Sequence, residues 1–210
     1  MTWIDVFVPA FVTLFVIVDP VGIAPMFAGL TQGTPAAYRR RMAIKGSLVA
    51  AVVLTGFALV GKPLLTALGI TIDALRVAGG FMLFLIALEM VFEKRTERRE
   101  KTADKFQSQP RPDDISVFPI AIPMVAGPGA IATVILLMTN HQDDWAGKGL
   151  VLAALGAVLV VTLITFLMAG KVMDILGATV ANIITRVLGV ILGALAAQYM
   201  LDGIRAALIA

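Results

Sequence analysis

Six long apolar stretches, separated by short polar segments, dominate the pattern of the chain. A helix needs about 20 mainly apolar residues to cross the hydrocarbon core of a bilayer, and every stretch reaches that length. The pattern therefore predicts an all-α integral membrane protein with six transmembrane helices. The expected spans are Trp3–Leu30, Met42–Gly61, Ile70–Phe92, Ile115–Thr139, Leu150–Gly170 and Leu176–Ile204.

Composition agrees with a membrane protein. Hydrophobic residues make up 59% of the 210 positions and charged residues 15%, and the mean hydropathy is +0.94. Soluble domains are closer to half apolar and a quarter charged. The chain has no cysteine, which excludes a disulfide framework and thiolate chemistry.

Positive charge gathers in alternate loops, and this bias predicts the orientation. One side has about twelve Lys and Arg residues, namely Arg39, Arg40, Arg41, Lys45, Lys94, Arg95, Arg98, Arg99, Lys101, Lys105, Arg111 and Lys171. The other side has Lys62, Lys148 and Arg205. Because cytoplasmic loops are enriched in Lys and Arg, we expect an inner- or plasma-membrane protein with both termini outside the cytoplasm.

A charged segment at residues 93–114 divides the spans three and three. It mixes both signs of charge and ends in prolines, which is typical of a solvated linker; a role at the lipid surface or toward a partner is the alternative. The expected organisation is a first three-helix repeat at 1–92, a cytoplasmic linker at 93–114 and a second repeat at 115–210.

The two halves share sequence features. Arg76-Val77-x-Gly79 in the third span matches Arg186-Val187-x-Gly189 in the sixth, and the first and fourth spans share a proline–glycine interruption. Since each half has an odd number of spans, two equivalent halves cross the membrane in opposite directions. We therefore expect an inverted repeat, the architecture of many secondary transporters.

The interruptions predict that the first and fourth spans are broken helices. Asp is a favoured N-cap and Pro a favoured first helical residue, so Asp19-Pro20 starts a second half-helix inside the first span. Gly127-Pro128 does the same in the fourth. The simpler interpretation is that Asp19 only caps a kink and Gly129 only allows close packing. A charged Asp at the bilayer centre costs about 2.5–3.5 kcal/mol on insertion scales, which favours a ligand site.

The motifs resemble a known family. D-P-V-G-I-A-P-M-F at 19–27, P-M-V-A-G-P-G-A-I-A-T at 123–133 and the paired R-V-x-G segments are similar to the MarC family of multi-pass membrane proteins. The resemblance covers essentially the whole chain except the linker. Some members are described as transporters of small neutral amino acids, so the resemblance implies a secondary transporter of substrates such as glycine or alanine.

The two breaks predict one asymmetric site near mid-membrane. Asp19 offers a carboxylate to an ammonium group, a proton or a sodium ion, and the free N–H groups around Gly129 and Ala130 suit a carboxylate. The expected binding residues are Asp19, Pro20, Gly22, Pro25, Gly127, Pro128, Gly129, Ala130 and Thr133. Asn182, Arg186 and Arg76 are candidates for a supporting polar network, with snorkelling to the interface as the alternative for the arginines.

Other chemistry has little support in the sequence. Glu89 is placed near the cytoplasmic end of its span, so no second acid accompanies Asp19, and His141 lies in an outer loop; we expect no enzyme, no cofactor and no metal site beyond a coupling proton or sodium. Nucleic-acid binding has no support beyond loop arginines. The expected partners are the lipid bilayer and a small solute, with the oligomeric state open. A channel-like pore, an exporter of another solute and a structural membrane subunit are the alternative functions.

Overall fold

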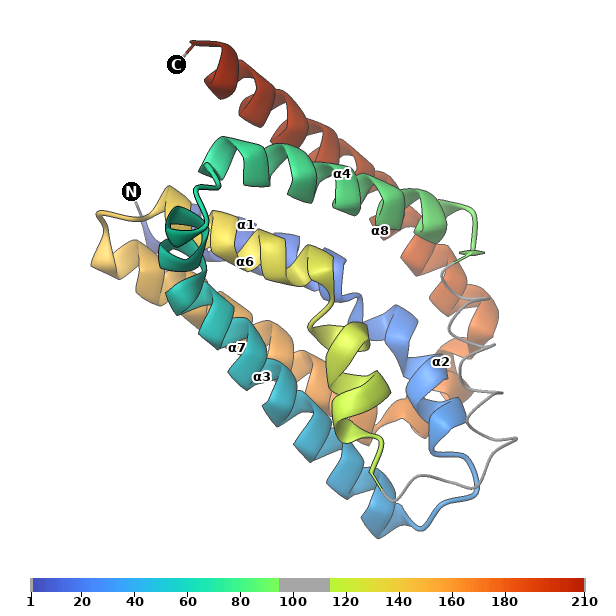
Figure 1. The fold of residues 1–210 in the computed structure, drawn as a ribbon. Helices are drawn as coiled ribbons and strands as arrows, with labels where there is room; N and C mark the ends of the chain where they lie inside the picture. Colours follow the sequence, from blue (N-terminus) through green and yellow to red (C-terminus); the bar gives the residue numbers. More distant parts are fainter. Residues whose placement is uncertain (1, 95–113, 210) are drawn as a thin grey trace.

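The computed structural model describes residues 2–94 and 114–209, and within these ranges the chain forms helices and no strand (Figure 1). The first half contains α1 (Trp3–Val18), α2 (Pro20–Leu30), α3 (Ala36–Ala67) and α4 (Ile72–Val91). The second half contains η1 (Ser116–Val125), α6 (Pro128–Asn140), α7 (Trp145–Leu167) and α8 (Ala169–Ile209). Most of the predicted linker, residues 95–113, lies outside the described residues.

The helices have the length and apolarity that membrane spans need. Five stretches qualify directly, and η1 with α6 makes a sixth when the two are taken as one span bent by 58°. The five are Trp3–Leu30, Ala36–Ala67, Ile72–Val91, Trp145–Leu167 and Thr179–Ile209. Large apolar side chains such as Val52, Leu59 and Val190 are more than half exposed on the outer faces, as expected of helices that face lipid. The prediction of an all-helical multi-pass membrane protein is confirmed at this level.

Two helices extend beyond the predicted membrane spans. Helix α3 runs from Ala36 to Ala67 rather than over Met42–Gly61, because Arg and Lys are good helix formers and continue the helix beyond the apolar stretch. Helix α8 begins at Ala169, before the expected start at Leu176, and is kinked at Gly177, where φ is 68°. That positive φ suits glycine, which has no Cβ to clash.

The segment η1 is less regular than the sequence indicated. Phe118 and Ile122 have extended backbone angles (φ −127° and −126°) inside this π-type helix. Each precedes a proline, Pro119 or Pro123, and the proline ring disfavours helical angles in the residue before it. The fourth predicted span therefore contains irregular backbone ahead of Gly127 as well as the expected interruption there.

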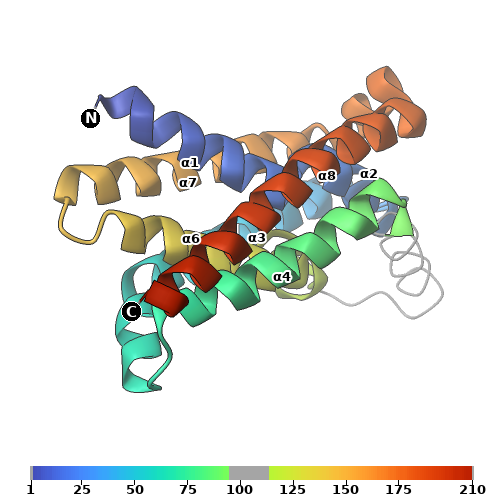
Figure 2. The same cartoon turned by 90° about the horizontal axis from the view of Figure 1, so that it is seen from above.

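Helix α4 lies beside the C-terminal half of α8 (Figures 1 and 2). Glycines bring the two backbones together: a Cβ added at Gly80 would lie 2.8 Å from the Ala196 carbonyl oxygen, and one added at Gly189 would lie 2.8 Å from Met90 Cβ. The pairing is antiparallel, since the residue numbers rise on one helix as they fall on the other. Small residues at such interfaces are how membrane helices approach closely without a hydrophobic driving force.

The turns between helices lie at two opposite ends of the bundle. Both termini, the α3–α4 turn and the α6–α7 turn lie at one end, on the left in Figure 1, and the α2–α3 turn lies at the opposite end (Figures 1 and 2). The basic residues Arg39, Arg40 and Arg41 at the start of α3 therefore lie at the end away from the termini.

The glycine contact between α4 and α8 gives a test of the packing. In Gly80→Ala the new Cβ would meet Met200 Cγ at 2.7 Å and a backbone oxygen at 2.8 Å, so we expect destabilisation of about 1–3 kcal/mol, typical of overpacking. Gly56→Ala on α3 is the matched control, because nothing lies within 4 Å of its new Cβ. Thermal unfolding of the purified variants in detergent measures both, and a Gly80→Ala protein as stable as Gly56→Ala would contradict this packing.

Candidate functional site

Two helices start inside the bundle, at Pro20 and at Pro128, and each has proline at its first position. The first four N–H groups of any helix have no partner within the helix, and they carry about half a positive charge. Partners for these groups must come from side chains, water or a ligand, since lipid offers none. The two starts meet this requirement in different ways.

The start of α2 is capped by the side chain of Asp19. Asp19 has φ 55°, and its Oδ1 accepts a hydrogen bond from the Gly22 N–H at 3.0 Å. Its own N–H donates to the Phe15 carbonyl at 2.9 Å, which closes the last turn of α1. One left-handed residue thus ends α1 and begins α2, as the capping preference of Asp predicts.

Helix α8 contributes a hydroxyl to the same group. Thr185 Oγ1 lies 3.4 Å from Asp19 Oδ1, and both side chains are buried, with Asp19 wholly inaccessible. A Cβ added at Gly22 would overlap Asp19 Oδ2 and lie 2.6 Å from Thr185 Oγ1, so only glycine fits beside the carboxylate. The sequence analysis missed Thr185; the available signal was a hydroxyl next to Arg186 in an apolar span.

The start of α6 has no side-chain cap. Gly127 is the N-cap residue in an extended conformation (φ −76°, ψ 168°), and it makes no side-chain cap hydrogen bond. Glycine has no oxygen to offer, unlike Asp19 at the other start. This end of α6 can therefore take an anionic group from outside the protein.

A cavity of about 270 Å³ lies against this uncapped end. Its wall includes Gly127, Pro128, Gly129 and Ala130, so four of the predicted site residues are brought together. The remaining wall is formed by Ile17, Met26, Ile86, Glu89 and part of η1. The lining is mainly apolar with a few polar groups, which is the usual character of small-molecule sites.

Glu89 was not among the predicted site residues. The sequence placed it near the end of its span and gave no second acid to accompany Asp19; α4 does end two residues later, at Val91, and this half-buried side chain lies on the cavity wall. It lies three residues after Ile86 on α4, and Ile86 also lines the cavity. Residues three apart share a helix face, but the sequence does not show which helix that face meets.

Thr133 lies one turn into α6 from Gly129, and its hydroxyl is fully buried without a hydrogen-bond partner among the described residues. Elsewhere in the described part of the chain, Thr139 and Thr162 each donate to the carbonyl four residues earlier, at 2.8 Å. Thr133 itself does not line the cavity. An unsatisfied buried hydroxyl costs about 1–3 kcal/mol.

The predicted site residues of the first proline–glycine motif lie apart from this cavity. Asp19, Pro20, Gly22 and Pro25 are not on its wall. Pro20 is buried at the first position of α2, and Pro25 is half-buried inside that helix. The structure thus gives two neighbouring features, the Asp19 cap and the cavity at α6, where the sequence predicted one site.

The predicted supporting arginines pair elsewhere. Arg76 bonds to Asp73 at 2.8 Å and to Asn140 at 3.2 Å. Arg186 is about half exposed and pairs with Glu93 at 2.5 Å. Asn182 is half-buried one turn before Arg186. The α8 side chain that reaches Asp19 is Thr185, one position from the expected arginine.

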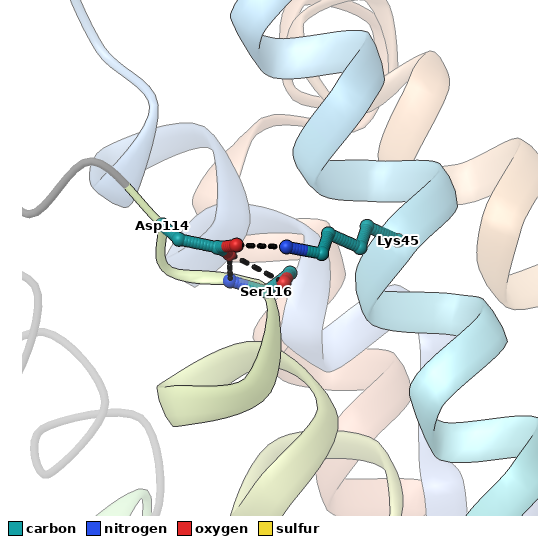
Figure 3. A network of polar contacts seen from close by, with 3 residues as sticks. All are labelled: Lys45, Asp114 and Ser116. Atoms are coloured by element: carbon teal, nitrogen blue, oxygen red, sulfur yellow. Dashed lines mark hydrogen bonds and ion pairs between the residues drawn. The ribbon is translucent and has the colours of Figure 1, made fainter.

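A polar cluster fixes the segment that forms one cavity wall. Lys45 on α3 pairs with Asp114, whose Oδ1 also accepts the Ser116 N–H at 2.9 Å and the Ser116 hydroxyl (Figure 3). The Lys45 ammonium and these hydrogen bonds hold the pKa of Asp114 well below its usual range. The cluster ties the start of η1 to α3.

Comparisons with known proteins agree on one family. The family described as MarC family integral membrane protein matches residues 4–208. The chain is 37% identical to the UPF0056 membrane protein MJ1677 of Methanocaldococcus jannaschii, over 97% of this chain and 98% of that one. It is 34% identical to YvbG of Bacillus subtilis (94% and 93% covered) and 35% identical to YhcE of Escherichia coli (93% and 90% covered), both UPF0056 membrane proteins. No solved structure matches the chain.

The unpartnered hydroxyl of Thr133 gives a test of the site. Thr133→Val removes a buried group that has no partner, so in ligand-free protein we expect no loss of stability, or a gain of up to about 1 kcal/mol. Thr162→Val is the matched control: its hydroxyl is equally buried but donates to Val158, so its loss should cost about 0.5–1.5 kcal/mol. Thermal unfolding in detergent compares the two. Equal destabilisation by both would show that the Thr133 hydroxyl is satisfied.

Proposed function

We propose a transport function for this chain on the premise that it belongs to the MarC family of integral membrane proteins, as the family match and the relatives show. The proposed function is secondary transport of small neutral amino acids, such as glycine or alanine, coupled to a proton or sodium gradient. The proposed location is the cell membrane. The names of the relatives specify membrane proteins and no substrate.

The observation that carries the proposal is the uncapped start of α6 inside a cavity. Gly127 supplies no cap, and the backbone of Gly129 and Ala130 lines the space. Free N–H groups at a helix start, in a site with little water, bind carboxylates well.

The size of the cavity favours a small solute. Its volume of about 270 Å³ is below the roughly 300–1,000 Å³ that drug-sized ligands occupy. A Cβ added at Gly129 would lie 2.9 Å from Leu83 Cδ2 and 3.0 Å from Ile86 Cδ1, so space directly above the α6 terminus is limited. An amino acid with a short side chain suits these dimensions.

The α4–α8 pair supports the proposed inverted repeat. Arg76 and Arg186 lie 110 positions apart in the matching motifs. A Cβ at Gly203 would lie 2.9 Å from Arg76 Cβ. If each of these two residues is replaced by its equivalent in the other half, 110 positions away, the pair becomes Arg186 and Glu93. These two residues form an ion pair in the structure. Such two-fold exchange is what two inverted, equivalent halves produce.

Asp19 is the proposed group for the coupling ion. Its carboxylate is wholly inaccessible, and a charged Asp at this depth costs about 2.5–3.5 kcal/mol on insertion scales. A bound proton or sodium ion removes that charge. Because Thr185 of α8 contacts Asp19, occupancy at Asp19 can influence how α8 packs against α2.

The test is uptake of glycine and alanine into proteoliposomes under imposed proton or sodium gradients. We expect saturable uptake, counterflow of labelled substrate and dependence on one of the two gradients. Asp19→Asn should abolish or uncouple uptake while folding stays largely intact, because Asn also caps helices well. Non-saturating flux without counterflow would instead support a channel-like pore. Absence of uptake for a broad panel of small solutes would favour a structural subunit.

The proposed orientation has its own test. About twelve Lys and Arg lie on one side and three on the other, and both termini lie at the end of the bundle away from the basic start of α3. We therefore expect a C-terminal alkaline phosphatase fusion to be active and a C-terminal green fluorescent protein fusion to be dark in bacteria. The reverse pattern would place the termini in the cytoplasm and exchange the two faces of the proposed transporter.

A further inference from the structure

We infer that Glu89 receives the ammonium group of the substrate, so that the cavity recognises the zwitterion as a whole. This inference rests on the proposed function and assigns a substrate contact to a residue outside both glycine–proline motifs. It also gives the two carboxylates different roles: Glu89 binds the amino acid, and Asp19 binds the coupling ion.

The geometry follows from how α4 crosses α6. A Cβ at Gly79 of α4 would lie 3.2 Å from Ala132 Cβ, whereas Ile86, two turns later on α4, lies beside the Gly129 position. The two helices therefore run in opposite directions at this contact. Glu89, three residues further along α4, is displaced about 4.5 Å along the helix axis from Ile86, beyond the first residue of α6.

This placement puts a negative group opposite a positive helix end across one small space. Glu89 and the four residues at the start of α6, Gly127 to Ala130, all line the cavity. A free carboxylate ligand would be attracted by the N–H groups of α6 but repelled by Glu89, and an amine would experience the reverse. An α-amino acid satisfies both, because its ammonium and carboxylate groups are attached to the same α-carbon and enter the cavity together.

Asp19 is less suited to the ammonium role. It is not on the cavity wall, its Oδ1 accepts the Gly22 N–H and the Thr185 hydroxyl, and it is wholly inaccessible. An amino acid bound at the start of α6 would have to displace packed side chains to reach it. Glu89 lies on the wall of the same cavity as the start of α6.

The experiment compares binding of alanine and of propionate, which lacks the ammonium group, to purified protein in lipid nanodiscs. Wild-type protein should bind alanine at least tenfold more tightly than propionate. In Glu89→Gln, alanine affinity should fall at least tenfold while propionate affinity stays the same or rises, so that the preference is lost. The matched control is Glu93→Gln, the same change one turn later at a residue that pairs with Arg186 outside the cavity, and it should keep the wild-type preference.

A second measurement uses the unmodified protein, in case Glu89→Gln does not fold. Carbodiimide labelling of Glu89, read by mass spectrometry, should be slowed by alanine but not by propionate at equal occupancy, and labelling of Glu93 should be unaffected. An unchanged alanine-to-propionate ratio in Glu89→Gln, or labelling of Glu89 that alanine does not slow, would overturn the role of Glu89 alone. Failure of wild-type protein to bind or transport any small amino acid would instead remove the proposed function, and this inference with it.

Discussion

The structure depends on one constraint: backbone N–H and C=O groups at membrane depth need partners, because lipid supplies none. Regular helices meet this constraint by themselves, and a helix that starts inside the bundle does not. At α2 the carboxylate of Asp19 bonds to the Gly22 N–H. At α6 no side chain caps the first turn, and a cavity lies beside it. The same sequence pattern, a cap residue followed by proline, therefore gives a helix start with a side-chain cap in one half and a helix start without one in the other.

Because the two helix starts are capped differently, a similar sequence pattern in the two halves produces two different local environments. At the start of α2, the Asp19 carboxylate is the hydrogen-bond acceptor. This carboxylate and Thr185 fill the space beside Gly22, so a side chain at position 22 would not fit. Gly127 brings no such acceptor, so the N–H groups of α6 stay available to a solute. If both starts carried Asp, each would be capped by its own side chain, and neither would offer free N–H groups to an anion.

Much of the fold could be predicted from the sequence, and the limits have physical causes. Apolar length predicts the helices, and the capping preferences of Asp, Gly and Pro, which are local properties, point to residues 20 and 128, where α2 and α6 begin. Thr185 and Glu89 could not be found in this way. Their roles depend on which faces of α8 and α4 meet Asp19 and Gly129, and an all-round apolar helix does not encode its neighbours in its periodicity. The irregular backbone of η1 was readable from Pro119 and Pro123, but apolarity alone suggested an ordinary span.

The packing of α4 on α8 supplies a physical link between the two proposed binding groups. Helix α8 carries Thr185 to Asp19, and α4 carries Glu89 to the cavity. Glycine contacts hold the two helices at close distance, so a shift of one displaces the other. Coupling between sites requires an element whose arrangement both ligands bias, and this helix pair is in contact with both. A cation at Asp19 that changes how α8 sits against α2 would therefore also change the position of Glu89 relative to the start of α6, and this is the relation between ion and amino acid that coupled transport requires.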